Sequence, residues 1–347
     1  MKFGTVVVCS KCKQPIVSGQ GFGYVCFKIP GKEANRLNLM RAIRKLPAGN
    51  KKLFFMHDVI GYQHSEIAGL VGCSTGCSKS QVHKARKEKT IMTLESTSSG
   101  GRVRDALSGR PKVAIVTGAS SGIGLEMVTR LIEKGYRVVA NSRRITSAMT
   151  LHSTADLKLV DGDIGIEETA KHVVCTAIQN FGTVDLLVNN AGVFIPKPFT
   201  EYTAEDFLRA MQTNLAGFFY VSQLAVAQMR LQKFGHVVNI STSLVSQPIA
   251  GVPGSLSNLT KAGLESVTRA LAIEFAAEGI RFNAIAPGVV NTPMHQAETH
   301  EFLKQLSPMK RLAEVEEVAD LLLYLESAHF VNGEVVHLDG GAHAGKW

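Results

Sequence analysis

The sequence has no apolar run near the roughly 20 residues that a membrane-spanning helix needs. Residues 1–23 also lack the basic and then apolar pattern of an export signal. Only 19% of the 347 residues are charged, yet 45% are apolar, which excludes a disordered or purely fibrous chain. We therefore expect a soluble, cytoplasmic protein, long enough for two units with a buried core.

Cysteine is scarce beyond the first third, where Cys175 is the only one. Without an export signal, the earlier cysteines do not indicate a secreted disulfide framework. Cys9, Cys12 and Cys26 resemble half of a zinc ribbon within residues 1–30. A closed structural zinc site needs four ligands, and the fourth is not evident. A zinc site at these three cysteines and an inert remnant therefore both stay open.

Basic residues concentrate in the first third of the chain. Residues 1–104 contain 18 Lys+Arg against 5 Asp+Glu (+13), which leaves 20 against 24 (−4) for residues 105–347. Such an excess favours a polyanionic partner, although simple solubility explains it equally well. A Ser- and Gly-rich stretch then predicts a linker over residues 91–109.

The second part alternates β-branched runs with helical patterns. This alternation predicts a doubly wound parallel sheet of the α/β Rossmann class. The expected strands are 113–116, 137–140, 186–188, 236–240, 281–285 and 334–338.

A glycine-rich turn, TGASSGIG at 117–124, joins the first of these strands to a helix expected to end near Glu133. Glycines let the backbone approach a pyrophosphate, whose charge the amides at the start of the helix can meet. The order strand, turn and helix therefore predicts a dinucleotide site.

Two arginines, Arg143 and Arg144, follow the second strand, where NAD-binding proteins place an acidic residue. Guanidinium groups bind a phosphate well, so we expect NADP, with NAD as the alternative. Two solvated arginines in a loop are the competing interpretation.

Several motifs in order give residues 110–347 a family resemblance: TGASSGIG, Asp163, NNAG at 189–192, Asn214, Lys261 and PGVVNT at 287–292. This part resembles the short-chain dehydrogenase/reductase family. The resemblance implies seven parallel strands, a homo-oligomer and a small carbonyl or alcohol substrate. It also implies that Asp163 and Ile164 border the adenine and that Thr292 holds the carboxamide. The candidate cofactor-binding residues are Gly118, Ser120, Ser121, Gly122, Ile123, Gly124, Arg143, Arg144, Asp163, Ile164, Asn190, Ala191, Gly192, Lys261, Pro287, Gly288 and Thr292.

The catalytic positions depart from the family pattern. The family has a tyrosine four residues before its lysine, but here Ser257 precedes Lys261, and no tyrosine lies between residues 239 and 261. An aliphatic hydroxyl titrates far above a phenol and is a poor primary acid. The candidate catalytic residues are Asn214, Thr242 or Ser243, Ser257 and Lys261.

Three interpretations of this centre stay open. Hydride transfer could persist, with solvent or a polar residue such as Ser257 supplying the proton. Alternatively, the site binds NADP without turnover, or the Ser-rich segment is an ordinary loop. We expect a helix over 262–278 after the lysine.

Residues 36–90 read as helical pieces, of which the last two have helix-turn-helix spacing, with Ser74 or Thr75 as the cap. The match over residues 38–89 resembles region 4 of extracytoplasmic-function sigma factors, without a region 2. The candidate DNA contacts are Lys79, Ser80, His83, Lys84 and Arg86. A DNA-binding module, a fusion relic and helices with a solvated basic face remain as alternatives.

The sequence thus predicts an NADP(H)-dependent oxidoreductase behind a DNA-binding-like module. A non-catalytic, NADP-binding transcriptional regulator is the alternative.

Overall fold

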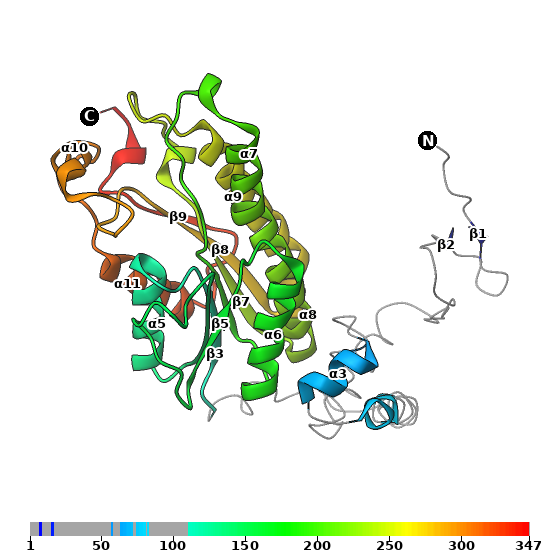
Figure 1. Cartoon of the computed structure of the whole chain (residues 1–347). Helices are drawn as coiled ribbons and strands as arrows, with labels where there is room; N and C mark the ends of the chain where they lie inside the picture. Colours follow the sequence, from blue (N-terminus) through cyan, green and yellow to red (C-terminus); the bar gives the residue numbers. More distant parts are fainter. Residues whose placement is uncertain are drawn as a thin grey trace.

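The computed structural model describes residues 7–8, 15–16, 57, 63–71, 74–80, 82 and 110–346. Its main feature is a sheet of seven parallel strands in the order β5-β4-β3-β6-β7-β8-β9 (Figure 1). The strands are β3 (Val113–Thr117), β4 (Arg137–Ser142), β5 (Leu157–Asp161), β6 (Leu186–Asn189), β7 (Gly235–Ile240), β8 (Ile280–Pro287) and β9 (Val335–Leu338). The order reverses between β3 and β6, which is where doubly wound sheets open a crevice for ligands.

Helices cover both faces of the sheet (Figure 1). One face carries α6 (Glu167–Phe181), α8 (Gly217–Gln232) and α9 (Ser255–Phe275), and the other carries α5 (Gly122–Glu133) and α11 (Val315–Ser327). The short elements are η1 (Phe199–Glu201), α7 (Ala204–Ala210), the π-helix η2 (Met211–Ala216), η3 (Ser243–Val245), η4 (Ala276–Glu278), η5 (Ala297–Thr299), α10 (His300–Lys304) and η6 (Ala342–Ala344).

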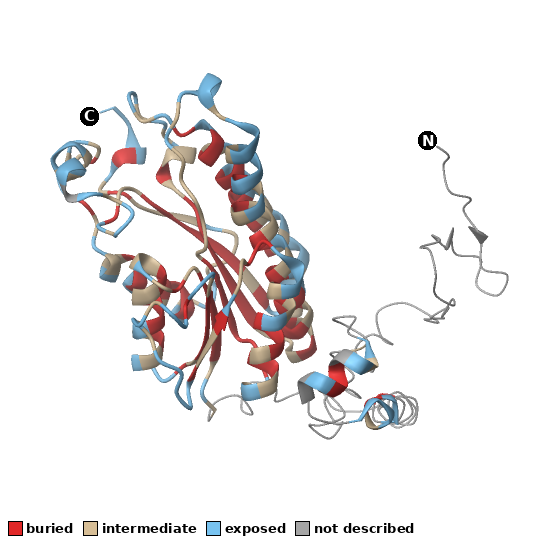
Figure 2. Ribbon diagram, viewed as in Figure 1, coloured by how far each residue is buried: buried red, intermediate tan, exposed pale blue. Residues whose placement is uncertain are grey.

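The core lies on both faces of the central strands (Figure 2). Every residue of β3 is buried, as expected for a strand with helices above and below it. Ile115 packs towards α6 and α8, whereas Ala114 and Val116 pack towards α5 and α11. The predicted α/β Rossmann class is therefore confirmed.

Two expected elements differ from the structure. The edge strand β5 was not predicted from its pattern, because LKLVD mixes Lys158 and Asp161 with apolar residues, and only two of its five positions are buried. The helix expected over 262–278 begins earlier, at Ser255, so that prediction was wrong. Three residues spaced by four are buried, namely Leu256, Thr260 and Leu264. This spacing extends the buried face of α9 by two turns towards its N-terminus.

The amino ends of the strands are tied together by charged groups. Arg110 pairs with buried Asp185 through two contacts, Nη1 to Oδ2 at 2.6 Å and Nη2 to Oδ1 at 2.7 Å. Beside them, buried Glu326 accepts a hydrogen bond from the Tyr136 hydroxyl at 2.6 Å and pairs with His236 Nδ1 at 2.6 Å. These contacts connect the amino ends of the strands to one another and to the residue that precedes β3.

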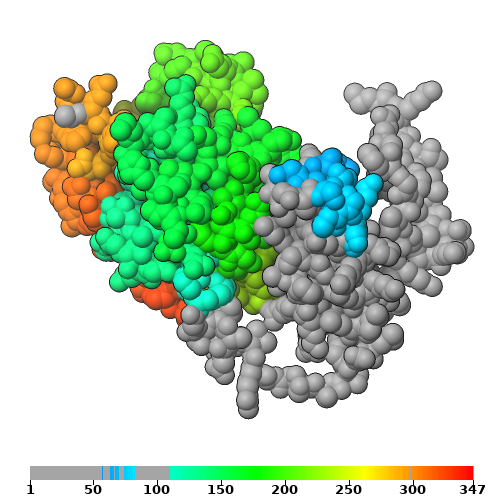
Figure 3. Space-filling model, turned by 60° about the horizontal axis from the view of Figure 1, so that its bottom comes forward, coloured from blue at the N-terminus to red at the C-terminus, as the bar shows by residue number. Residues whose placement is uncertain are grey.

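Part of the predicted helix-turn-helix segment is described, as α3 (His64–Val71) and a helical stretch over 75–80. Ser74 caps the second piece, because its Oγ accepts a hydrogen bond from the Cys77 amide at 3.1 Å. Ile67 is buried in the same apolar cluster as residues of α6 and α8, and Figure 3 shows this blue segment against the green part of the chain.

The remaining N-terminal predictions have little structural counterpart. The strands β1 (Val7–Val8) and β2 (Pro15–Ile16) pair antiparallel. The cysteines predicted to bind zinc, and three of the predicted DNA contacts, lie outside the described residues: Cys9, Cys12, Cys26, His83, Lys84 and Arg86.

None of the helices described is long and apolar enough to cross a membrane.

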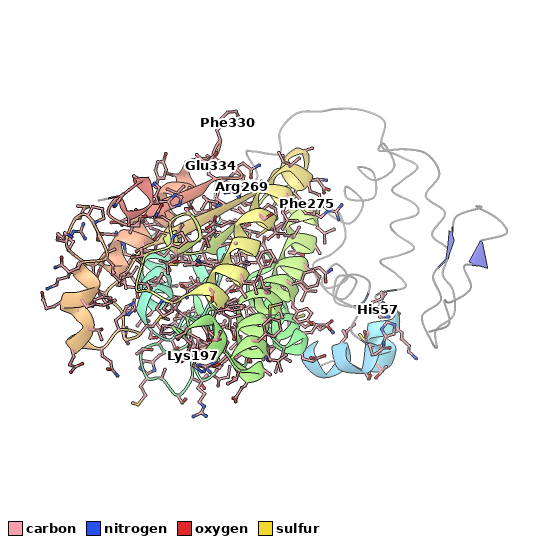
Figure 4. The ribbon with its side chains drawn as sticks, turned by 90° about the horizontal axis from the view of Figure 1, so that it is seen from above. His57, Lys197, Arg269, Phe275, Phe330 and Glu334 are labelled. Carbon is pink, nitrogen blue, oxygen red and sulfur yellow. The ribbon has the colours of Figure 1, made fainter. Side chains whose placement is uncertain are left out.

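On the surface, Phe330 is fully exposed and projects from the same side of the molecule as Arg269 and Glu334 (Figure 4). The predicted homo-oligomer stays a prediction.

Candidate active site

A cavity of about 330 Å³ lies at the carboxyl ends of the central strands. Most of the candidate site residues line it, although they come from segments spread over the chain from β3 to the loop after β8. They are Gly118, Ser121, Gly122, Ile123, Gly124, Asn190, Ala191, Gly192, Thr242, Ser243, Ser257, Lys261, Pro287, Gly288 and Thr292. Ser120, Arg143, Arg144, Asp163, Ile164 and Asn214 are not part of this lining.

The glycine turn after β3 is packed too closely for side chains. Gly118 has φ +66°, and a Cβ there would lie 2.8 Å from the Cα of Ala191. A Cβ on Gly124 would lie 2.3 Å from the carbonyl oxygen of Gly118. The Asn190 amide holds the turn, donating to the carbonyls of Thr117 at 2.9 Å and of Gly118 at 3.1 Å. Only glycine fits these positions.

The first turn of α5 carries no compensating charge. Ser121 is the N-cap, but no side-chain hydrogen bond caps the helix, and its first turn has no acidic residue. The amides and the positive end of the helix dipole are therefore available to an anion. Thr292 covers this point from the opposite wall, with its Cγ2 3.2 Å from the Cβ position of Gly122.

A second polar region adjoins the ends of β4 and β5. Arg143 and Arg144 are exposed, and neither pairs with a carboxylate of the described residues. The hydroxyls of Ser120 and Ser142 share a hydrogen bond of 2.9 Å beside them. Asp163 is held by the Gly165 amide, which donates to its Oδ1 at 2.9 Å.

Asn214 is buried behind the cavity in the π-helix η2. Its Oδ1 accepts a hydrogen bond from the Val193 amide at 2.8 Å, and its Nδ2 donates to the Val193 carbonyl at 3.2 Å and to Thr260 Oγ1 at 3.0 Å. The wide turn of a π-helix is common where a side chain must reach a functional site. Asn214 here holds the backbone of Val193, the residue that follows NNAG.

Lys261 is the buried cation of the cavity. It is 7% exposed, and its Nζ donates to the Ile240 carbonyl at 2.6 Å. Burial lowers the pKa of Lys261 to about 8, because an ammonium group loses hydration in the protein interior. A Cβ on Gly192 would lie 3.0 Å from this Nζ, so the glycine leaves space in front of the cation.

Three candidate catalytic hydroxyl groups, those of Thr242, Ser243 and Ser257, line the cavity with Lys261. Ser257 lies one turn before it on α9 and is buried. Ser243 is also buried, whereas Thr242 caps η3 by accepting from the Leu244 amide at 3.4 Å. The structure therefore brings both candidates for the family's serine position to the same wall.

Two features of this site were not found from the sequence. Ser241 lines the cavity and donates from its Oγ to buried Glu265 at 2.6 Å. His295, three residues after Thr292, lines the cavity itself. No local pattern marks either residue, because each reaches the site through tertiary packing.

A wider depression of about 730 Å³ lies at the opposite, amino edge of the sheet. Its lining includes Arg110, Tyr136 and Glu326 but none of the candidate site residues. Since Arg110, Lys112 and Glu326 of this lining already form ion pairs, the cavity at the carboxyl edge is the better candidate for chemistry.

The sheet order, the glycine turn and the uncapped helix together define a dinucleotide-binding protein of the Rossmann class. Residues 118–343 match the family described as enoyl-(acyl carrier protein) reductase. The chain belongs to the short-chain dehydrogenase/reductase family of oxidoreductases, as predicted. Residues 36–88 match region 4 of sigma-70, which confirms the second resemblance.

Individual relatives cover the same part of the chain. An acetoacetyl-CoA reductase from an Acinetobacter species is 34% identical over 248 residues, which are 67% of this chain and 98% of the relative. The structure of ElxO with NADP bound is similar with a TM-score of 0.63 and 27% identity, over 68% of this chain and all of ElxO. A 3-ketoacyl-(acyl-carrier-protein) reductase from Brucella melitensis, complexed with NADH, has a TM-score of 0.63 and 29% identity, over 67% and 98% of the two chains.

Proposed function

We propose that residues 110–347 form an NADP(H)-dependent oxidoreductase that acts on a small carbonyl or alcohol. The observation that carries this proposal is that one cavity joins the glycine turn to Lys261 and to the hydroxyl groups of Thr242, Ser243 and Ser257. The names of the relatives support it, since they include reductases of ketoacyl substrates and structures with NADP or NADH bound.

The residues present fit such a cofactor. A pyrophosphate would lie against the amides of the glycine turn, where a Cβ on Gly124 would have no room. Asp163 and Ile164 would border the adenine, and Lys261 would bind the ribose in the space left by Gly192. Asn190, Ala191, Pro287, Gly288 and Thr292 would line the remaining length of the cofactor. A bound nicotinamide supplies or accepts hydride at the reacting carbon.

The preference for NADP over NAD rests on Arg143 and Arg144. Both are exposed at the end of β4 and carry no ionic partner among the described residues, so they are available to a 2′-phosphate. Ser120 and Ser142 add hydroxyl donors beside them. Changing both arginines to glutamine should weaken NADPH binding at least tenfold and leave NADH binding unchanged in calorimetry. An equal effect on both coenzymes would show that the arginines do not contact the 2′-phosphate.

At the reacting end, Ser243 or Thr242 would orient the substrate oxygen through a hydroxyl hydrogen bond. Lys261 stays charged below its pKa of about 8 and holds the ribose end of the site in place. Ser257 stands where the family has its tyrosine, and its hydroxyl can relay a proton through water but is a poor acid itself.

The test is NADPH oxidation by the full chain, followed by absorbance across a panel of ketones and ketoacyl thioesters. We expect turnover with at least one of them and binding of NADPH in calorimetry. Binding of neither NADPH nor NADH would refute the proposal.

A second function, that of a non-catalytic NADP-binding transcriptional regulator, is favoured by the sigma-70 region 4 match over residues 36–88. Lys79 and Ser80 are exposed on the helical stretch that Ser74 caps, and residues 1–104 contain 18 Lys+Arg against 5 Asp+Glu. This alternative predicts promoter binding that weakens with salt and changes when NADPH is added. Promoter binding without any response to NADPH would leave the two modules uncoupled.

A further inference from the structure

Few groups in the cavity can exchange a proton near neutral pH. Among the described residues that line it, Lys261 and His295 are the only ones with a titratable side chain. No tyrosine, aspartate, glutamate or cysteine belongs to this lining. Since Ser257 occupies the tyrosine position of the family, a proton donor for the substrate must come from another side chain or from water.

His295 belongs to the loop between β8 and α10, which covers the cavity opposite α9. Its amide donates to the Thr292 carbonyl at 3.0 Å, which closes a turn at this point of the loop. Thr292 in turn contacts the glycine turn at the start of α5. All four residues of this turn line the cavity: Thr292, Pro293, Met294 and His295. The turn therefore places His295 in the cavity wall, beside the expected cofactor site.

The surroundings of His295 favour a neutral imidazole that is readily protonated and deprotonated. Burial lowers its pKa below the ordinary histidine value, and the nearby charge of His300 lowers it further. His300 Nε2 is buried and has no hydrogen-bond partner among the described residues. Lys261 is the only lysine or arginine in the described lining of the cavity, and this lining contains no carboxylate.

We propose that His295 is the acid–base catalytic residue of this chain, in the role that tyrosine has in its family. This inference rests on the oxidoreductase function proposed above. In reduction, the carbonyl carbon accepts hydride from the reduced nicotinamide and forms the new C–H bond. The carbonyl π electrons move to oxygen, which takes the proton from the His295 imidazolium, and the neutral imidazole then regains a proton from water. Oxidation of an alcohol reverses each transfer.

Lys261 is less suited to this role. Its Nζ already donates to the Ile240 carbonyl at 2.6 Å and faces the space in front of Gly192, where the ribose is expected. His295 has no side-chain hydrogen bond to another described residue that would hold it in such a fixed position.

The first experiment compares wild type with His295→Gln in NADPH-dependent ketone reduction by the full chain. Loss of a general acid should lower kcat about 100-fold or more, while calorimetry should show unchanged NADPH binding. His329→Gln is the matched control, because His329 is exposed at the opposite edge of the sheet. A His295→Gln enzyme with wild-type kcat would refute the role of His295 and leave the proposed function intact. A wild type that binds NADPH but reduces no substrate would refute the proposed function itself.

The pH dependence gives a readout that a structural role would not produce. Reduction by wild type should decline as the pH rises through a pKa below the ordinary histidine value of about 6.5. His300→Gln should move this decline to higher pH, because it removes the neighbouring charge. Without any cofactor, NMR of ring-labelled histidine should show the His295 signal titrating in the same range. A midpoint above 6.5 would overturn the proposal.

Restoring the tyrosine completes the test. In the double variant Ser257→Tyr with His295→Gln, a phenol one turn before Lys261 should recover at least a tenth of the wild-type kcat. The decline of reduction with pH should then move to the alkaline range. His295→Gln should lower kcat less in the Ser257→Tyr background than in wild type. An equal fall in kcat in both backgrounds would show that His295 does not donate the substrate proton.

Discussion

Replacing Lys261 with methionine tests the electrostatic cost of the buried ammonium group. The pKa of Lys261 is about 8 in the folded chain, against about 10.4 for lysine in an unfolded chain. Each unit of difference corresponds to about 1.4 kcal/mol, so charged Lys261 lowers the free energy of unfolding by about 3 kcal/mol at pH 7. Between the two pKa values the unfolded chain binds more protons, and the stability of wild type therefore rises with pH in that window.

The variant also loses the hydrogen bond to the Ile240 carbonyl, which costs about 1 to 3 kcal/mol. The difference at a single pH is therefore less informative than its change with pH. We expect the stability of wild type, relative to Lys261→Met, to rise by about 2 kcal/mol between pH 7 and 9.5.

The assay is urea unfolding of the full chain without cofactor, followed by circular dichroism at several pH values. Lys134→Met serves as control, because Lys134 is exposed at the end of α5. Groups other than Lys261 titrate in both proteins and cancel in the comparison. A difference between wild type and Lys261→Met that is constant from pH 7 to 9.5 would refute the assigned burial of this cation.

Three further predictions concern packing and charge. Gly124→Ala places a Cβ 2.3 Å from the Gly118 carbonyl, so it should cost about 1 to 3 kcal/mol in unfolding and weaken NADPH binding in calorimetry. Glu326→Gln removes the buried carboxylate that pairs with Lys112 and Arg281 and should cost about 3 kcal/mol or more at pH 7. Burial raises the pKa of Glu326, but the hydrogen bonds to His236 and Tyr136 and the charge of Lys112 outweigh it and hold the pKa below its usual range, so that cost should shrink as the pH falls below about 4. Thr203→Ala removes the cap of α7 and should cost about 1 kcal/mol, with NADPH binding unchanged as its check.

The features that depend on local chemistry were accessible from the sequence. The turn at 117–124 needs glycine at positions with no room for a Cβ, and its place between a buried strand and a helix is visible in the printed sequence. Ser74 likewise carries its capping role in its residue type and its position before the helix. That Ser257 and Lys261 lie one helical turn apart was not predicted, because the helix was expected to start after the lysine.

Features that depend on tertiary contacts were not accessible. The strand β5 lies at the edge of the sheet, so it tolerates the charged residues that hid its pattern. His295 enters the cavity only because its loop folds over the carboxyl edge of the sheet, and nothing in its neighbouring residues encodes that path. The π-helix around Asn214 is similar, since its extra width serves contacts to Val193 and Thr260 from distant segments.

The bidentate ion pair between Arg110 and Asp185 determines where a preceding segment joins the sheet. It anchors the described chain at the amino edge just before β3 begins, whereas substrates and coenzyme would enter from the carboxyl edge. Whatever precedes Arg110 is therefore attached on the side away from the entrance to the cavity. A segment that precedes β3 therefore joins the sheet at a point distant from the cavity lining.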